Sequence, residues 1–350
     1  MTALVTGAAG LLGGHMVDAL VERGERVRAF VRADDDGARL ARLGVDVRRG
    51  DLRDRAAVRA AVAGVEVVHH CAARTGPWGP EADHRAVNVY ALKALVDAAL
   101  AAGVRRILHV SSITVHGNDI GGSAGEDARL RQEPNPYSRS KVAGERMLGR
   151  LIAERGAPIT IVRPGWMYGP RDTASFARFA AMIERGQMVV IGDGDNHVPL
   201  IYARDVAEGM ALAGATPQAA GRVYLLVNDE PVTQRHYLDA IANALGVDAP
   251  RRRIPYRVAL ALGAAAEWAG HVTRRAQPPP LMRYGVQLLG GENRFDITRA
   301  RRELGFAPRT SLVEGVRLSV AWYRGERTAP SDASEAGGAE KQRARAATRA

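Results

Sequence analysis

Tyr137 and Lys141 form the residue pair whose types and spacing most directly suggest acid–base chemistry in this sequence. Residues four apart lie on one face of an α-helix, so the phenol and the ammonium would be neighbours if this segment is helical. Asn135–Pro136, directly before Tyr137, is typical of a helix start. An ammonium beside a phenol favours the phenolate and lowers the phenol's pKa from about 10. Such a phenol could exchange a proton with an alcohol oxygen near neutral pH.

The usage of basic residues supports a special role for Lys141. The chain has 350 residues and 49 lysines and arginines, of which only Lys93, Lys141 and Lys341 are lysines. Arginine is bulkier and differently hydrated, so it cannot replace a compact ammonium in a tight site. A lysine kept here in an arginine-rich chain therefore favours a functional pair over a chance spacing. Lys93 breaks the same usage, and the sequence offers no reason for it.

A hydroxyl group is available at the end of a predicted strand, Arg106–Ser111, which Ser112 follows directly. A hydroxyl at such a strand end could donate to a substrate oxygen and stabilise developing charge. Either serine could equally cap a turn, and position alone does not choose between them.

A glycine-rich turn joins a predicted strand, Ala3–Thr6, to a predicted helix. Gly7, Gly10 and Gly13 permit a tight turn and close approach of the backbone to a pyrophosphate. The helix start at Leu11 and Leu12 would then offer N–H groups and positive potential to the phosphates. Because the turn follows a strand and opens a helix, the sequence predicts a dinucleotide site.

The residue after the second predicted strand bears on the choice of dinucleotide. NAD-preferring sites place an acid at the end of this strand, Arg26–Val31, to bind the ribose 2′-hydroxyl, whereas Val31 holds that place here and Arg32 follows it. A guanidinium pairs with a 2′-phosphate, so we expect NADP(H) to be preferred, with NAD(H) as the alternative. The following Asp34–Asp36 could present an acid in a shifted register, and Arg32 could also be an ordinary solvated arginine.

Alternating strand and helix patterns in the first half predict the α/β class. We expect a Rossmann-type, doubly wound parallel sheet with a smaller mixed α/β substrate domain. The predicted domains are residues 1–165 with a return segment 205–228, a mainly substrate-binding region 166–325, and a disordered tail 326–350. The remaining sheet strands are expected at Asp46–Arg49, Val65–His70, Thr160–Arg163 and Val223–Val227. Capping boxes are predicted to open helices at Asp205 and Ser311.

Composition excludes several classes of function. Cys71 is the only cysteine, so no intrachain disulfide can form, and a reducing, cytoplasmic location is expected. The net charge of +11 comes from scattered arginines with only 5% aromatic residues, which argues against nucleic-acid binding. The apolar segment Val258–Trp268 is too short to cross a membrane, and contact with a membrane surface is not expected. His69 and His70 would point to opposite faces of a strand, so no metal site is predicted.

Taken together, these segments resemble the extended short-chain dehydrogenases of the NAD-dependent epimerase/dehydratase superfamily. Within it, the chain looks most like the branch of 3β-hydroxysteroid dehydrogenases, sterol dehydrogenases and 3-ketoacid reductases. The residues that carry this second resemblance are Gly192–Asp193–Gly194 through Tyr202, Gly221–Tyr224, Glu230–Thr233 and the Ile254–Pro255 segment with its apolar helix. The resemblance covers most of residues 1–324. Its marks are the glycine turn, Gly50–Asp51–Leu52, Cys71–Ala72–Ala73, Asn88, Ser111–Ser112, Tyr137 with Lys141, Arg163–Pro164, Tyr168–Gly169–Pro170 and Phe295–Asp296.

The resemblance implies roles for individual residues. Ser112, Tyr137 and Lys141 would be catalytic, with the latter two also contacting the cofactor. Further cofactor contacts would come from Asp51 and Leu52 near adenine, Ala72 and Ala73 near the ribose, Asn88 and Pro164. Trp78, Trp166, Met167 and Tyr168 are candidates for the substrate pocket, or for an ordinary hydrophobic cluster. The chain departs from the family's pattern at His116, where tyrosine is usual, and at Ala91–Leu92. The family also implies a homodimer.

The resulting hypothesis is an NADP(H)-dependent oxidoreductase that interconverts a ketone and a secondary alcohol on a small, apolar molecule. A 3-oxo acid, a sterol or a polyketide-like ketone would suit it. The first alternative is a nucleotide-sugar epimerase or dehydratase. Those enzymes usually carry an arginine where this chain has Val198, and the dehydratases carry an acidic pair where it has Ile113 and Thr114. Both departures argue against this alternative. A second is an NADP-sensing protein without catalysis, although such proteins usually lose the tyrosine or the lysine.

Overall fold

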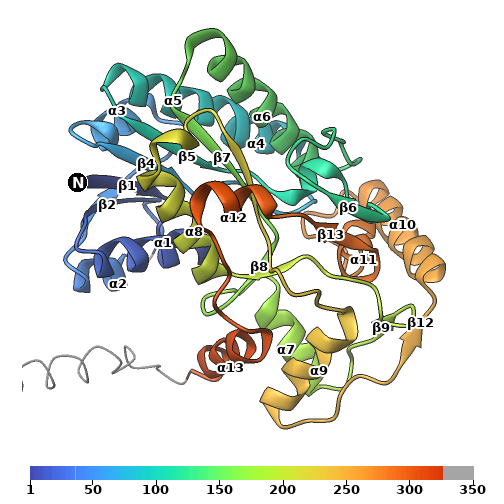
Figure 1. Cartoon of the computed structure of the whole chain (residues 1–350). Helices are drawn as coiled ribbons and strands as arrows, with labels where there is room; N and C mark the ends of the chain where they lie inside the picture. The colour runs from blue at the N-terminus through green and yellow to red at the C-terminus, as the bar shows by residue number, and fades with distance from the viewer. Residues whose placement is uncertain (36, 326–350) are drawn as a thin grey trace, which may run out of the picture.

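A seven-stranded parallel sheet forms the centre of the structure (Figure 1). The structure is a computed structural model that describes residues 1–35 and 37–325. Asp36 and the predicted tail 326–350 lie outside the described residues. The strand order β11-β7-β5-β4-β1-β2-β3 confirms the predicted doubly wound fold. The strands are β1 (Thr2–Thr6), β2 (Arg26–Val31), β3 (Asp46–Arg49), β4 (Val67–His70), β5 (Arg106–Val110), β7 (Ile159–Pro164) and β11 (Val223–Leu226).

Helices cover both faces of the sheet because successive strand residues point to opposite sides. On β1, Ala3 and Val5 pack into one hydrophobic core, whereas Leu4 packs into another. The first core faces helices α1 (Leu11–Glu22), α8 (Ala203–Ala215) and α12 (Thr298–Leu304). The second faces α3 (Arg55–Val62), α5 (Leu92–Ala101) and α6 (Pro136–Arg155). The sheet is thus buried on both sides, and its strand ends are the places left for chemistry.

A smaller lobe, built mostly from residues after Gly165, has a third hydrophobic core (Figure 1). Its helices are α7 (Phe176–Glu184), α9 (Gln234–Leu245), α10 (Tyr256–Val272), α11 (Arg283–Gly290) and α13 (Leu312–Tyr323). Three short parallel pairs accompany them: β8 (Trp166–Tyr168) with β10 (Leu200–Tyr202), β9 (Val190–Ile191) with β12 (Arg253–Ile254), and β6 (Gly122–Ala124) with β13 (Asn293–Phe295). The short elements are α2 (Ala38–Arg42), α4 (Glu81–Arg85), a π-helical turn η1 (Ala86–Ala91) and the 3₁₀ turns η2 (Ile113–His116) and η3 (Pro217–Ala219).

Side-chain caps begin several helices where the sequence predicts them, with one exception. Asn135 caps α6, because its side chain accepts from the N–H of Ser138, and Ser311 caps α13 in the same way. The predicted capping box at Asp205 is wrong, because α8 begins at Ala203 and Asp205 lies inside its first turn. The Asp205 carboxylate instead accepts hydrogen bonds from the backbone N–H and the hydroxyl of Thr310. No helix in the described ranges is long and apolar enough to cross a membrane.

Buried histidines are a feature of the sheet. His70 pairs with Thr6 on β1, at 2.7 Å between Nδ1 and Oγ1, and its ring stacks on that of His109 on β5. His69 points to the other face, near Gly214 of α8. This confirms that the adjacent pair cannot converge on one ligand. Burial lowers the pKa of both His69 and His70 to about 3, so both rings are neutral at neutral pH.

These neutral rings predict a fall of stability with acidity. Between pH 6.5 and 3 the unfolded chain binds a proton at His69 that the folded chain excludes, so the free energy of unfolding drops as pH falls through this window. We expect His69→Leu to flatten the pH dependence by about 1.4 kcal/mol per pH unit below pH 6. Denaturant titrations from pH 7 to 4.5 would measure it, with the exposed His236→Asn as the control. Equal slopes for His69→Leu and the parent protein would contradict this interpretation.

Candidate active site

A cavity of about 1080 Å³ lies outside the carboxyl ends of the sheet strands, where this class of fold binds its ligands. The segments that follow β1, β2, β4, β5 and β7 all contribute to its wall. It brings together most of the residues predicted from the sequence: Gly7, Gly10, Leu11, Leu12, Gly13, Arg32, Asp51, Leu52, Ala72, Ala73, Ser112, Tyr137, Pro164, Trp166 and Met167.

The glycine turn has the geometry that a bound pyrophosphate needs. Gly7 has φ of +67°, and a Cβ there would lie 2.8 Å from Ala72 Cα. A Cβ on Gly13 would lie 2.1 Å from the carbonyl oxygen of Gly7, so the helix and the turn are in contact at this point. The start of α1 thus faces the cavity directly, and the residues present fit a dinucleotide.

Two arginines and two aspartates line the end of the cavity beyond β2 and β3. Arg32 lies 3.1 Å from Asp35 and 3.5 Å from Asp34, measured between side-chain N and O atoms, and its side chain remains 69% exposed. Arg53 forms an ion pair with Asp51. The pKa of Asp51 is lowered, chiefly by the hydrogen bond from Arg53. Both guanidinium groups are therefore accessible, although each already pairs with its own carboxylates, and either could turn toward a 2′-phosphate.

Four hydroxyl groups meet at the end of the cavity beside β5. Ser112 donates to the Thr114 hydroxyl at 3.0 Å, and Thr114 lies 3.2 Å from the hydroxyl of Tyr284 on α11. The side chain of Ser112 is also hydrogen-bonded to Tyr137, which lowers the pKa of that phenol. The network therefore joins Tyr137 on α6, the loop after β5 and the smaller lobe.

Burial changes the expected ionisation of Tyr137. The ammonium was expected to lower its pKa, but the pKa is raised, first by burial and second by the neighbouring Tyr284, despite the Ser112 hydrogen bond. The Lys141 Nζ lies over the phenol ring, 5.9 Å from the ring centroid, and donates to the carbonyl oxygen of Val110 at 2.8 Å. Burial also lowers the pKa of Lys141 to about 8. The expectation of an acidic phenol is therefore wrong for this arrangement, in which Tyr137 is neutral and keeps its proton.

Four predicted residues do not line the cavity. Lys141 lies behind Tyr137, and Asn88 binds the backbone of Arg74 and the hydroxyl of Ser140. Trp78 packs outside the cavity, where its ring stacks on His271. Tyr168 is buried among Tyr202 and Tyr237 in the core of the smaller lobe, so it belongs to the hydrophobic cluster that was its alternative.

Sequence reasoning missed several residues of the site, among them Thr114, Arg171 and Tyr284. Thr114 follows Ser112 by two residues in a hydroxyl-rich stretch, which was a usable signal. Tyr284 is far away in sequence and reaches the site only through the packing of α11. Arg171 lines the cavity from the loop after β8 and binds Asp18 of α1 at 3.0 Å.

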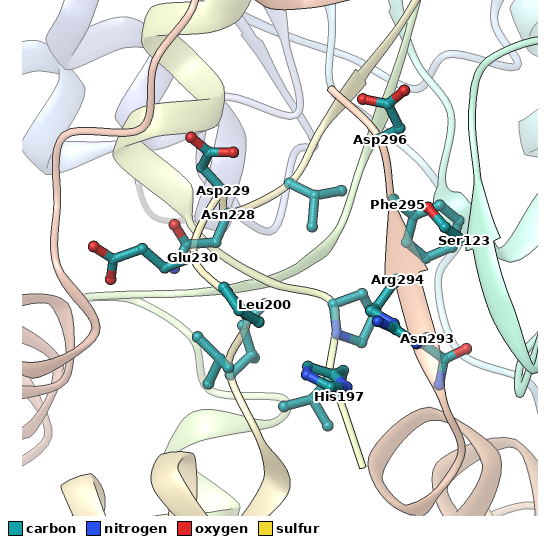
Figure 2. A pocket seen from close by; sticks show the side chains of 15 residues that line it. Ser123, His197, Leu200, Asn228, Asp229, Glu230, Asn293, Arg294, Phe295 and Asp296 are labelled. Carbon is teal, nitrogen blue, oxygen red and sulfur yellow. The ribbon is translucent and has the colours of Figure 1, made fainter. Parts of the chain in front are cut away.

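A second, smaller cavity of about 440 Å³ lies elsewhere in the molecule (Figure 2). Its wall includes His197, Asp229, Glu230, Arg294 and Asp296, and it contains none of the predicted site residues. Two of its three carboxylates have structural partners, because Asp229 pairs with Arg301 and Asp296 accepts hydrogen bonds from the backbone N–H and the hydroxyl of Thr298. We therefore assign the chemistry to the larger cavity.

The contact between Gly13 and Gly7 predicts the effect of adding one methyl group. Gly13→Ala should push the helix from the turn, destabilise the fold by about 1–3 kcal/mol and weaken dinucleotide binding by about tenfold or more. Fluorescence titration with NADPH and thermal unfolding would measure both. Gly149→Ala on the exposed face of α6 is the matched control, because a Cβ there meets nothing within 4 Å and should stabilise the helix. Undiminished binding by Gly13→Ala would argue against a pyrophosphate at this turn.

Comparison with known proteins agrees with this geometry. The family model for the NAD dependent epimerase/dehydratase family matches residues 3–226. The chain is 31% identical to 2-alkyl-3-oxoalkanoate reductase of Stenotrophomonas maltophilia, over 91% of this chain and 98% of the relative. It is 35% identical to sterol demethylase protein B of Methylococcus capsulatus, over 93% and 98%. The crystal structure of gox2253 aligns with a TM-score of 0.79 at 29% identity, covering 93% of this chain and 98% of that one. The chain therefore belongs to the NAD-dependent epimerase/dehydratase family, as its motifs suggested.

Proposed function

We propose that this NAD(P)-dependent oxidoreductase interconverts a ketone and a secondary alcohol on an apolar substrate, with NADP(H) as its preferred cofactor. The observation that carries the proposal is the meeting of Tyr137 and Ser112 in one cavity with the glycine turn. Hydroxyls, a buried ammonium and a dinucleotide turn together are what carbonyl reduction requires. The name of the reductase from Stenotrophomonas maltophilia, which acts on a 2-alkyl-3-oxoalkanoate, supports the same class of reaction.

The chain's own residues would manage the proton. Ser112 and Tyr137 donate hydrogen bonds to the substrate oxygen and so stabilise the charge that develops on it. Because burial raises the pKa of Tyr137, its phenol is neutral and has a proton to give as a ketone is reduced. Lys141 holds the helix against Val110 and places its positive charge behind the phenol, where it stabilises the phenolate after transfer. The nicotinamide, when bound, supplies or accepts the hydride.

The substrate side of the cavity favours an apolar molecule. Its wall includes Ile113, Trp166, Met167, Tyr284 and Leu288. These side chains would bury an alkyl chain or ring system, while the hydroxyl groups fix the position of the carbonyl. A 3-oxo acid, a sterol or a polyketide-like ketone fits this description.

The nucleotide-sugar alternative has less support in the site. Val198, where those enzymes usually carry an arginine, is buried and lines the smaller cavity. Ile113 and Thr114 replace the acidic pair of the dehydratases, and Thr114 is engaged with Ser112 and Tyr284. A diphosphate would meet no guanidinium at the position of Val198.

The homodimer, the absence of nucleic-acid partners and the cytoplasmic location stay predictions from the sequence.

Removal of the phenolic hydroxyl tests the assignment of Tyr137. Tyr137→Phe should lower turnover by about 10²- to 10⁴-fold, because the substrate oxygen loses its proton donor, and should leave NADPH binding largely intact. Oxidation of NADPH with a panel of apolar ketones, read at the nicotinamide absorbance, measures the first, and a fluorescence titration the second. Tyr90→Phe, at a residue that is 61% exposed, is the control. Retained turnover in Tyr137→Phe would end the proposal.

A change at Arg32 tests the cofactor preference. Arg32→Ser should raise KM for NADPH by about 10- to 100-fold through loss of charge-assisted hydrogen bonds, and leave KM for NADH nearly unchanged. Arg48→Ser is the matched control, since Arg48 is an exposed arginine that pairs with Asp46 on the neighbouring β3. Equal effects of Arg32→Ser on both cofactors would show that Arg32 does not recognise a 2′-phosphate.

A further inference from the structure

Helix α10 exposes one continuous apolar face. Val258, Leu262, Trp268 and Val272 recur at helical spacing, and their exposed fractions are 46%, 50%, 69% and 63%. Exposed alanines at 261, 265 and 269 fill the same face. The opposite face packs inward through Ala259, Gly263 and Gly270. Four of the nine large hydrophobic residues that are exposed in the described chain thus gather on this single helix, which favours a binding surface over chance exposure.

Exposed arginines stand at both ends of this apolar face. Arg251–Arg253 and Arg257 precede or begin the helix, and Arg274 and Arg275 follow it. None of these six forms an ion pair with another residue that the structure describes. The one acidic residue between 249 and 282, Glu267, is turned inward, where it pairs with Arg283 at 2.8 Å. The face is therefore apolar in its middle and positive at its ends, and α10 itself carries no exposed carboxylate, whereas the exposed Asp248 lies three residues before Arg251.

The helix is also joined to the cavity through two neighbouring segments. Gly263 packs against the backbone of Met282 and Arg283 at the start of α11, the helix that places Tyr284 and Leu288 in the cavity wall. At its other end, His271 stacks on Trp78, whose indole N–H donates to the carbonyl oxygen of Arg275 at 3.0 Å. The loop of Trp78 leads back to Ala72 and Ala73 of the cavity. Figure 1 shows α10 beside α11 at the outer edge of the smaller lobe.

We propose that α10 is a docking surface for an anionic lipid membrane, on which the helix lies with its apolar face among the acyl chains and its arginines at the headgroups. Charge complementarity argues for this occupant, because arginine pairs with lipid phosphate, six exposed arginines flank the face, and α10 itself has no exposed acid to repel it. A Trp on such a face is typical of a helix in the membrane interface. The proposal revises the expectation from the sequence, which did not show that this side of the helix is exposed.

Docking would serve an apolar substrate, which partitions into lipid and would enter the cavity beside α11 and the Trp78 loop without crossing water. This benefit rests on the proposed function, but the docking itself does not. Binding to vesicles is measured without turnover, so the Tyr137→Phe variant should bind them as the parent protein does. Failure of the reductase proposal and failure of the docking proposal are therefore separate outcomes.

Co-sedimentation of the full chain with vesicles tests the docking. The parent protein should sediment with phosphatidylcholine mixed with phosphatidylglycerol, bind phosphatidylcholine alone much more weakly, and be released by salt. Trp268→Ser/Val272→Ser and Arg251→Glu/Arg252→Glu should each reduce binding by about tenfold or more. The matched controls are Val313→Ser on α13, an exposed valine, and Arg55→Glu/Arg59→Glu on α3, which should bind as the parent does. Thermal unfolding would verify that every variant is folded.

Two results would overturn the proposal. One is a parent protein that does not bind vesicles, or α10 variants that bind them as strongly as the control variants do. The other is a change of oligomeric state, in which Trp268→Ser/Val272→Ser turns a dimer into a monomer during size-exclusion chromatography without any vesicle binding. That result would assign the face to a second copy of the chain.

Discussion

Helix α6 carries Tyr137 and Lys141, and its position depends on a buried ion pair one turn further along. Glu145 of α6 binds Arg163 of β7 through several hydrogen bonds, the shortest 2.6 Å, and both side chains are at most 5% exposed. The same guanidinium donates to the carbonyl oxygen of Glu126 and contacts His116. Such a pair adds little net stability over apolar packing, but breaking it leaves an uncompensated buried charge. It therefore admits one register of α6 on the sheet and so fixes where the phenol lies.

The ammonium of Lys141 adds a second constraint. Its hydrogen bond to the carbonyl oxygen of Val110 ties α6 to the end of β5, the strand that leads directly into Ser112. One buried cation thus holds together α6, which carries Tyr137, and the segment after β5, which carries Ser112. The hydroxyl of Tyr284 reaches the same network from the smaller lobe. A substrate oxygen placed among them would find donors that are already oriented, which lowers the cost of reorganisation during reaction.

The sheet, the glycine turn and the cap of α6 could be predicted from sequence because local rules decide them. Periodicity gave the strands to within a residue or two, and Asn135–Pro136 marked the helix start. Burial of individual groups could not be predicted, since it depends on packing between distant segments. For that reason the pKa of Tyr137 is raised where the sequence predicted a lowered one, and Tyr284 and Arg171 were missed. Lysine scarcity was an imperfect guide, because Lys93 forms only an ordinary surface pair with Asp97.

The two ends of the larger cavity differ in chemistry. This difference indicates at which end a charged cofactor and an apolar substrate would each bind. The end near β2 and β3 is charged and open, with Arg32 and Arg53 beside carboxylates that compete for them. The end beneath α11 is apolar, apart from the hydroxyl network. A phosphorylated dinucleotide bound in reverse would keep its central pyrophosphate near the glycine turn but would place its 2′-phosphate beside Met167 and Leu288, away from Arg32 and Arg53, at a large desolvation cost. The polarity gradient therefore favours one orientation, in which the reactive end of the cofactor would meet the hydroxyls of Ser112 and Tyr137.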